Sequence, residues 1–231
     1  MKQPIDTEIE ERLRVIFDRV AEATERSGRK PEEVQIMAVT KTVPPARVNS
    51  ALACGIRLIG ENRVQEFLEK REEYDISSDK IHFIGHLQTN KVKYIIDKVN
   101  LIESVSSIKL AEEISRHASA SGILMNVLAE VNIAAEDSKS GFLEADLSEA
   151  VQAIAELPGI RLKGLMCIPQ KGSGDYYFAK MYELFTQLRE QKISGTEFSL
   201  LSMGMSGDYE DAIRRGSNLV RLGSAIFGAR T

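Results

Sequence analysis

The order in which apolar and polar segments follow one another restricts the fold of this chain more than any other feature. Short apolar runs alternate with longer stretches in which apolar residues recur at the spacing of an α-helix. Parallel strands need crossover segments, which are usually helices, so the alternation predicts a parallel sheet with helices outside it. The predicted strands are residues 34–40, 56–60, 80–85, 100–103, 123–132, 160–166, 196–201 and 218–222.

Eight such units favour a closed (β/α)8 TIM barrel over an open, doubly wound sheet. An additional helix before the first strand begins with Thr7 and Glu10 at capping-box spacing, ends at Gly28 and supplies the eighth outer helix. Because no linker rich in Pro, Gly or Ser divides the chain, we expect residues 1–231 to form one domain. The other predicted helices lie near residues 44–55, 62–73, 89–97, 106–121, 143–157, 175–192 and 207–215.

Charge and residue usage narrow the class of protein. The formal net charge of -4 gives no general attraction to nucleic acid or to an anionic membrane. No run approaches the ~20 apolar residues of a membrane span, and the amino terminus lacks the apolar core of a signal peptide. Cys54 and Cys167 lie outside any CxxC pattern, and the histidines have no metal-ligand spacing. We therefore predict a cytoplasmic protein without a metal site.

The first predicted strand ends at a lysine. In the segment QIMAVTKTVPP, Lys41 follows the apolar run and precedes Pro44 and Pro45, which can extend neither a strand nor the interior of a helix. Active sites of such barrels lie at the carboxyl ends of the strands, so Lys41 is a candidate functional residue, with a solvated rim lysine as the alternative. Other strand ends carry Glu61, Asn62, His86, Ser104, Ser106, Asn132, Met166 and Pro169.

Two glycine-rich segments follow the last two predicted strands, SMGMSG at 202–207 and GSAIFG at 223–228. Glycines let the backbone approach a ligand closely. Ser206 and Ser224 can each cap a following helix, which leaves backbone amides available to an anion. In (β/α)8 barrels phosphate often binds between the loops after strands seven and eight. The segments therefore predict a phosphate site, with a pair of tight turns as the alternative.

Closure of the barrel pairs the last strand with the first and brings this phosphate site beside Lys41. Arg221 lies two residues before Gly223, so it points into the barrel if Val220 and Leu222 pack against the outer helices. The alternative is an Arg221 that points outward with its stem along a helix. A lysine, an arginine and an anion cradle together suit a ligand with both an aldehyde and a phosphate, such as pyridoxal 5'-phosphate.

Each predicted group has a use in binding pyridoxal 5'-phosphate. A lysine forms a Schiff base with the aldehyde, the cradle fixes the phosphate, and a third group faces the pyridine nitrogen. An arginine in this third role keeps the ring nitrogen unprotonated and weakens the ring as an electron sink, whereas an acidic group would do the opposite.

Seven segments spread over nearly the whole chain carry a resemblance to a known family. They are MAVTK around Lys41, IGENRVQE at 59–66, HFIGHLQTNK at 82–91, VNIAAEDSKSGF at 131–142, GLMCIP at 164–169, LSMGMSGDYEDAI at 201–213 and VRLGSAIFGAR at 220–230. In these segments the sequence resembles the pyridoxal phosphate homeostasis proteins, which are alanine-racemase-like barrels.

The resemblance implies a role for each matched residue. Lys41 would hold the cofactor as a Schiff base, Arg221 would face the pyridine nitrogen, and Asn62 would lie near the cofactor. The phosphate would be held by Ser206, Gly223 and Ser224, and the site wall would include His86, Met166 and Gly207.

The sequence departs from the family pattern at two positions. The family typically has Thr where Ser224 stands and Asp where Gly207 stands. Serine keeps the hydroxyl, so phosphate binding is still expected, whereas Gly207 could loosen the start of the helix after the seventh strand.

The resemblance also implies a function. Racemases of this type add a β domain and a catalytic tyrosine from a partner subunit, and this chain ends just after the eighth unit, so we expect it to lack the second acid/base. The implied protein is a monomeric carrier and regulator of pyridoxal phosphate, without established turnover, that affects amino-acid and keto-acid balance and supplies pyridoxal-phosphate-dependent apoenzymes. Two alternatives stay open: a small racemase with Lys41 as single base, and a barrel enzyme that binds a sugar phosphate through Lys41.

Overall fold

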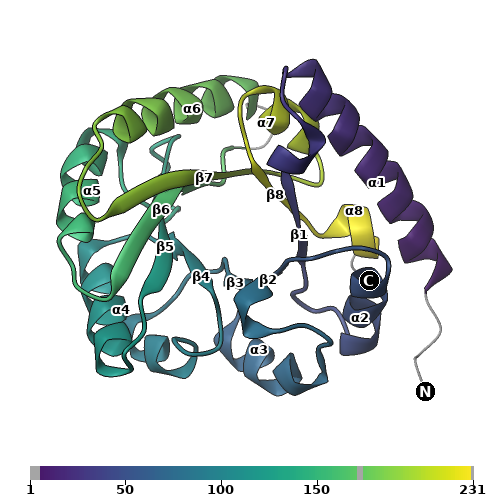
Figure 1. Cartoon of the computed structure of the whole chain (residues 1–231), viewed down its shortest axis with the longest axis horizontal. Helices are drawn as coiled ribbons and strands as arrows, with labels where there is room; N and C mark the ends of the chain where they lie inside the picture. The colour runs from purple at the N-terminus through teal and green to yellow at the C-terminus, as the bar shows by residue number, and fades with distance from the viewer. Residues whose placement is uncertain (1–5, 171–173, 230–231) are drawn as a thin grey trace.

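Eight parallel strands close into a barrel in the order in which they occur along the chain (Figure 1). The computed structural model describes residues 6–170 and 174–229. It confirms the predicted alternation of strands and helices and the closed (β/α)8 barrel. The strands are β1 Gln35–Val39, β2 Ile59–Glu61, β3 Ile81–Phe83, β4 Leu101–Val105, β5 Met125–Val131, β6 Ile160–Cys167, β7 Thr196–Met205 and β8 Leu219–Leu222.

Helices cover the outside of the barrel. The first of them, α1, lies beside β1 and β8 and packs against α2, α7 and α8, which is the place expected for the additional outer helix (Figure 1). The α-helices are α1 Thr7–Arg26, α2 Pro45–Ala53, α3 Val64–Lys70, α4 Ile108–Ala120, α5 Leu147–Ala155, α6 Gly174–Glu190, α7 Tyr209–Arg214 and α8 Ser224–Phe227. Short 3-10 helices are η1 Pro31–Glu33, η2 Arg71–Glu73, η3 Ser78–Lys80, η4 Thr89–Tyr94 and η5 Glu144–Asp146.

Two local predictions are wrong. The cap of α1 is Asp6 and not Thr7, because the Asp6 carboxylate accepts hydrogen bonds from the N–H groups of Glu8 and Ile9. The segment 89–97 does not form an α-helix, and its first part is the 3-10 helix η4. Its valine, two isoleucines and tyrosine lose side-chain freedom in an α-helix, which disfavours that conformation.

Apolar side chains form one large core outside the barrel and two small clusters inside it. The outer core fills the space between strands and helices, because alternate residues of each strand point to opposite faces. Inside, one cluster comes from β1, β8, the residue before β2 and the residue after β3, and the other comes from β4, β5 and β6. Their buried members are Met37, Leu58, Ile84 and Leu219 in the first cluster and Leu101, Leu128 and Met166 in the second.

The parallel pairing of β8 with β1 closes the barrel. In this register Met37 is the partner of Arg221, and Ala38 is the partner of Leu222. The loop that follows β1 therefore begins beside the loop that follows β8. This confirms the predicted neighbourhood of the segment that carries Lys41 and the second glycine-rich segment.

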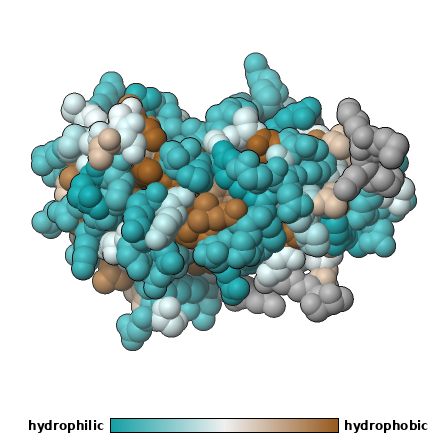
Figure 2. All heavy atoms as spheres, turned by 90° about the horizontal axis from the view of Figure 1, so that it is seen from below, coloured by the Kyte–Doolittle hydropathy of each residue, from teal (hydrophilic) through white to brown (hydrophobic). Residues whose placement is uncertain are grey.

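Figure 2 shows one face of the molecule, seen from below the view of Figure 1. This face is mostly hydrophilic, with apolar side chains gathered near its middle and in a few smaller areas. Within the described residues, no helix combines the length and the hydrophobicity that a bilayer crossing requires.

Gly85 lies where the chain after β3 approaches the chain after β2 too closely for a side chain. A Cβ atom at this position would be 2.0 Å from the backbone oxygen of Asn62. Gly207, in contrast, has open space around it, since a Cβ atom there would meet nothing within 4 Å. The two glycines therefore form a matched pair for a test of this close approach.

We expect Gly85→Ala to lower the free energy of unfolding by about 1–3 kcal/mol, because the backbone of Asn62 has to move away from the new methyl group. The measurement is urea denaturation followed by circular dichroism. Gly207→Ala is the control and should change stability by no more than about 0.5 kcal/mol. Equal stability of the two variants would contradict the close approach.

Candidate functional site

The loop after β1 presents Lys41 on a supported turn. Lys41 is half-buried, and the next residue, Thr42, has a left-handed backbone with φ 62°. A β-branched residue rarely adopts this conformation, so the turn needs support from its surroundings. The Glu66 carboxylate on α3 accepts a hydrogen bond from Thr42 N–H and pairs with Lys70, which donates to Val43 O at 3.0 Å. α3 therefore fixes the turn that carries Lys41.

Glu66 carries a negative charge in this arrangement. Burial alone would raise the pKa of its carboxyl, but the hydrogen bonds from Lys70 and from Thr42 N–H outweigh burial and lower the pKa. The ionised carboxylate is the form that accepts both hydrogen bonds.

Arg221 points into the barrel, as strand parity predicts. Its side chain is only 3% exposed. Nη2 donates to Cys167 O at 2.7 Å, and Nη1 donates to Ser202 Oγ at 2.5 Å. The neighbours Val220 and Leu222 lie in the outer core. The guanidinium is thus held in one orientation by two strands on its own side of the barrel.

A chain of hydrogen bonds runs from Arg221 across the interior of the barrel. Ser202 Oγ donates to Glu103 Oε2 at 2.6 Å, and the same Glu103 oxygen lies 4.0 Å from Arg221 Nη1. The other oxygen, Glu103 Oε1, lies 2.7 Å from His82 Nδ1. All four side chains are buried. Glu103 therefore supplies the charge that compensates Arg221.

Ser206 connects the two glycine-rich loops. β7 runs to Met205, farther than predicted, so Ser206 is the first residue after the strand. Its Oγ accepts hydrogen bonds from the backbone N–H of Gly223 at 3.2 Å and of Ala225 at 3.1 Å. The two amides thus converge on one point between the loops.

The predicted helix caps in these loops are wrong. Asp208 occupies the cap position of α7, and Gly223 occupies that of α8. Ser224 is the first residue of α8 and is exposed, as is Gly207 after Ser206. Ser206 does not cap α7, because its hydroxyl accepts hydrogen bonds from the backbone after β8 instead.

A cavity of about 240 Å³ lies at the carboxyl ends of β2, β3, β5 and β6, and Asn62, His86 and Glu130 line it. Asn62 Oδ1 is buried and has no hydrogen-bond partner in the described part of the chain. His86 Nδ1 is 3.3 Å from Ser140 Oγ. Burial raises the pKa of Glu130, although the charge of Arg221 opposes the shift. The cavity offers an amide oxygen, an imidazole and a carboxyl group to a small polar ligand.

Two further strand-end residues, Glu61 and Met166, are fully buried. Glu61 points away from the barrel axis, and its Oε1 accepts hydrogen bonds from Thr40 Oγ1 at 2.6 Å and from Tyr74 Oη at 2.7 Å. Met166 is fully buried in one of the interior apolar clusters. Glu61 therefore supports the wall of the barrel.

The sequence interpretation missed the residues that support Lys41 and Arg221. Glu66 and Lys70 stand four residues apart, a spacing that signals an ion pair on a helix. Glu103 and Ser202 lie in predicted strands or at their ends, and only the three-dimensional arrangement shows that they meet. Among residues 6–170 and 174–229, no group of three His, Cys, Asp or Glu side chains could hold a metal ion.

Comparison with known proteins decides the family. Residues 13–231 match the family model described as alanine racemase, N-terminal domain. The pyridoxal phosphate homeostasis protein of Aquifex aeolicus (strain VF5) is 42% identical over 224 residues, which cover 95% of this chain and 97% of that protein. This chain belongs to the pyridoxal phosphate homeostasis protein family. The resemblance found in the seven sequence segments is therefore confirmed.

Two solved structures share the fold of this homeostasis-family chain over almost their whole length. A crystal structure of an unknown protein from Bifidobacterium adolescentis has a TM-score of 0.90 and 38% identity, covering 97% of this chain and 98% of that one. PipY of Synechococcus elongatus PCC7942, solved with PLP bound, has a TM-score of 0.80 and 31% identity, covering 95% and 100%.

Glu61 is expected to make the stability of this family member depend on pH. Burial raises the pKa of its carboxyl, against hydrogen bonds from Thr40 and Tyr74 that lower it, so the folded state keeps this proton to a higher pH than the unfolded state. Stability is therefore lost as the pH rises from the ordinary pKa of a glutamate through the raised one. The Glu61→Gln variant has no carboxyl group at this position, so its free energy of unfolding does not fall with pH for this reason.

Urea denaturation between about pH 5 and pH 8 measures this effect. The free energy of unfolding of Glu61→Gln, minus that of the unchanged protein, should increase with pH. The exposed Glu69, altered to Gln, is the control and should give a flat difference. A flat difference for Glu61→Gln would show that its carboxyl does not hold the proton in the folded state.

Proposed function

We propose that this chain binds pyridoxal 5'-phosphate and serves its homeostasis and carriage in the cytoplasm. The observation that carries the proposal is the register of β1 with β8, which brings the Lys41 loop, the buried Arg221 and the Gly223 loop to one end of the barrel. An amine, a cation and converging amides match the aldehyde, the ring nitrogen and the phosphate of this cofactor. The PLP bound in PipY and the role named for the Aquifex aeolicus relative support the proposal.

The two glycine-rich loops fit the phosphate. The amides of Gly223 and Ala225 already converge on Ser206 Oγ, so the loops are arranged around an acceptor oxygen. A Cβ atom at Gly223 would make only ordinary contact with Val39, at 3.6 Å or more, so packing does not require glycine there. The absence of a side chain at Gly223 would instead let an anion approach the backbone closely. Ser224, exposed at the start of α8, supplies a further hydroxyl.

Arg221 and Asn62 fit the ring. The hydrogen bonds to Cys167 O and Ser202 Oγ fix the guanidinium of Arg221, which would face the pyridine nitrogen and hold it unprotonated. Asn62 Oδ1, buried without a partner among the described residues, would accept a hydrogen bond from the ring substituents. When bound, the cofactor supplies an aldehyde that forms a Schiff base with the Lys41 amine. His86, Met166 and Gly207 would complete the surrounding wall.

The proposed role is that of a carrier and not of an enzyme. Arg221 in place of an acidic partner weakens the electron sink on which racemisation depends. The whole chain would act as one cofactor-binding unit, as a monomer, and would release pyridoxal phosphate to apoenzymes that require it.

Lys41→Ala should abolish the Schiff-base absorbance band, leave no adduct after borohydride reduction and weaken pyridoxal phosphate binding by at least about tenfold. Absorbance titration and mass spectrometry of the reduced protein measure these effects. Lys109→Ala, which removes an exposed lysine of α4, is the control and should bind as the unchanged protein does. An unchanged protein that takes up no pyridoxal phosphate would disprove the proposed function.

The racemase alternative has its own test. The loaded protein is incubated with L-alanine, and the chiral composition is followed over time. We expect no change beyond that caused by free pyridoxal phosphate. Faster racemisation that depends on Lys41 would overturn the carrier role and favour the racemase.

Ser206→Ala should weaken pyridoxal phosphate binding by about tenfold or more, because the hydroxyl that links the two phosphate loops is lost. The dissociation constant is measured by absorbance titration. Ser224→Thr keeps a hydroxyl and is the matched control, with a change of less than about threefold expected. Equal affinities of Ser206→Ala and the unchanged protein would exclude a role of Ser206 at the phosphate.

A further inference from the structure

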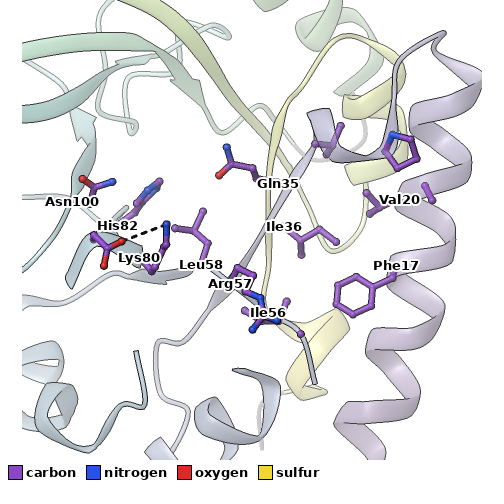
Figure 3. Close-up of a pocket in the computed structure, with 15 residues that line it drawn as sticks. Phe17, Val20, Gln35, Ile36, Ile56, Arg57, Leu58, Lys80, His82 and Asn100 are labelled. Carbon is purple, nitrogen blue, oxygen red and sulfur yellow. Dashed lines mark ion pairs between the residues drawn. The ribbon is translucent and has the colours of Figure 1, made fainter. Parts of the chain in front are cut away.

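A second cavity, of about 500 Å³, lies at the amino-terminal ends of β1, β2 and β3. Figure 3 shows Phe17 and Val20 of α1 on one side of this cavity and His82 and Asn100 on the other. Its volume falls within the range of small-molecule sites, about 300–1,000 Å³. The loop that carries Lys41 follows the carboxyl end of β1, so the second cavity is separate from the proposed cofactor site.

His82 presents a neutral imidazole to this cavity. The residue is 4% exposed, and its Nδ1 lies 2.7 Å from Glu103 Oε1. The carboxylate of Glu103 already balances the buried charge of Arg221, 4.0 Å away, so a second proton on the imidazole would leave a net positive charge in the interior. Burial of an uncompensated charge is costly. The neutral ring therefore donates Nδ1–H to Glu103, and Nε2 is a hydrogen-bond acceptor.

The acceptor atom of His82 has no use inside the protein. Within the described part of the chain, no hydrogen bond is made by Nε2. Nε2 is not completely sealed from solvent, so a molecule in the cavity can reach it. Buried polar groups normally have a hydrogen-bond partner, and the contact with Glu103 already fixes the direction of this one. The cavity thus offers a fixed acceptor to a ligand that carries an O–H or N–H group.

Asn100 adds a donor beside this acceptor. The next residue, Leu101, is the strand partner of His82, and Asn100 N–H donates to Ile81 O at 2.8 Å, so Asn100 lies next to the histidine. Its side-chain oxygen is 3.4 Å from Asn126 Nδ2, whereas its own Nδ2 donates to no group among residues 6–170 and 174–229. A hydroxyl group both donates and accepts, so it matches the imidazole and the amide together.

The charges around the cavity favour a ligand without charge. Arg57, Lys80 and Asp79 line it, and Lys80 pairs with Asp79 at 3.4 Å (Figure 3). The lining is therefore net positive, which disfavours an ammonium group, and a carboxylate has only acceptors and cannot hydrogen-bond to Nε2. Apolar members of the lining are Phe17, Val20, Val34, Ile36, Ile56 and Leu58. An apolar molecule with one hydroxyl group meets these conditions.

We propose that this cavity binds a small uncharged phenol, whose hydroxyl donates to His82 Nε2 and accepts from the amide of Asn100. The ring of the ligand lies against the apolar part of the lining. A phenol suits the site better than an aliphatic alcohol, because its more acidic hydroxyl is the stronger donor to an imidazole nitrogen. The binding requires no cofactor, so the proposal stands or falls independently of the proposed function.

Phenol and anisole test the proposal without any change to the protein. Anisole keeps the ring and the oxygen of phenol but has no O–H group. The full-length protein, labelled with ¹⁵N in its histidines, is titrated with each compound and followed by NMR. Phenol should bind with a dissociation constant of about 1 mM, which is reasonable for so small a ligand, and anisole at least about fivefold more weakly. Phenol, but not anisole, should shift the Nε2 resonance of His82.

Two variants locate the site. Gln35 lines the cavity with an exposed side chain at the start of β1, so Gln35→Trp should fill the cavity and weaken phenol binding at least about tenfold. Gln187→Trp makes the same change at an exposed position of α6 and is the control, with unchanged binding expected. Asn100→Ala should weaken phenol binding about threefold, through loss of the amide donor. Circular dichroism checks that each variant folds.

Other results overturn the proposal. No binding of phenol up to about 10 mM, or undiminished binding by a folded Gln35→Trp variant, would exclude the cavity as the site. Equal binding of phenol and anisole, or an Nε2 resonance typical of a protonated ring, would exclude recognition by the neutral His82. The comparison of the two compounds uses the unchanged protein, so it decides the question even where a variant does not fold. A protein that binds phenol but takes up no pyridoxal phosphate would contradict the proposed function alone.

Discussion

Burial of the Arg221 guanidinium is the requirement on which the interior of this barrel depends. An isolated charge in an apolar interior is very costly, and it persists only with a compensating charge and a full set of hydrogen bonds. Glu103 provides the charge, and Ser202 and Cys167 O provide acceptors. Glu103 in turn needs a partner for its second oxygen, which His82 supplies. One buried cation thus dictates polar side chains on β3, β4 and β7.

This polar chain limits what the interior can contribute to stability. The apolar residues inside the barrel form two small clusters, whereas the continuous core lies between the strands and the outer helices. Hydrophobic stabilisation is roughly proportional to buried apolar area, so most of it arises in the outer layer. The interior is therefore available for binding chemistry, and the outer layer holds the barrel around it.

The barrel and the identity of its key loops could be predicted from the sequence because both depend on local patterns. Alternating apolar runs give the strands, and parity along β8 points Arg221 inward. The supporting contacts could not be predicted, since they join residues from separate elements. Nothing in the run around Glu103 indicates that its carboxylate meets Ser202, and nothing near Ser206 indicates that its hydroxyl serves the opposite loop. The error at Thr7 comes from a capping spacing that the neighbouring Asp6 overrode. The error at residues 89–97 comes from following the spacing of apolar residues without weighing their low helix propensity.

Pairing of the first strand with the last has a consequence for folding of the nascent chain. Contacts between distant parts of a chain form slowly, and domains emerge from the ribosome amino terminus first. The Lys41 turn and its supports on α3 are made early, whereas Arg221 and Gly223 are made near the end. The edge of β1 thus stays unpaired until β8 is synthesised and docks against it. During translation this edge is therefore exposed to pairing with wrong strand partners.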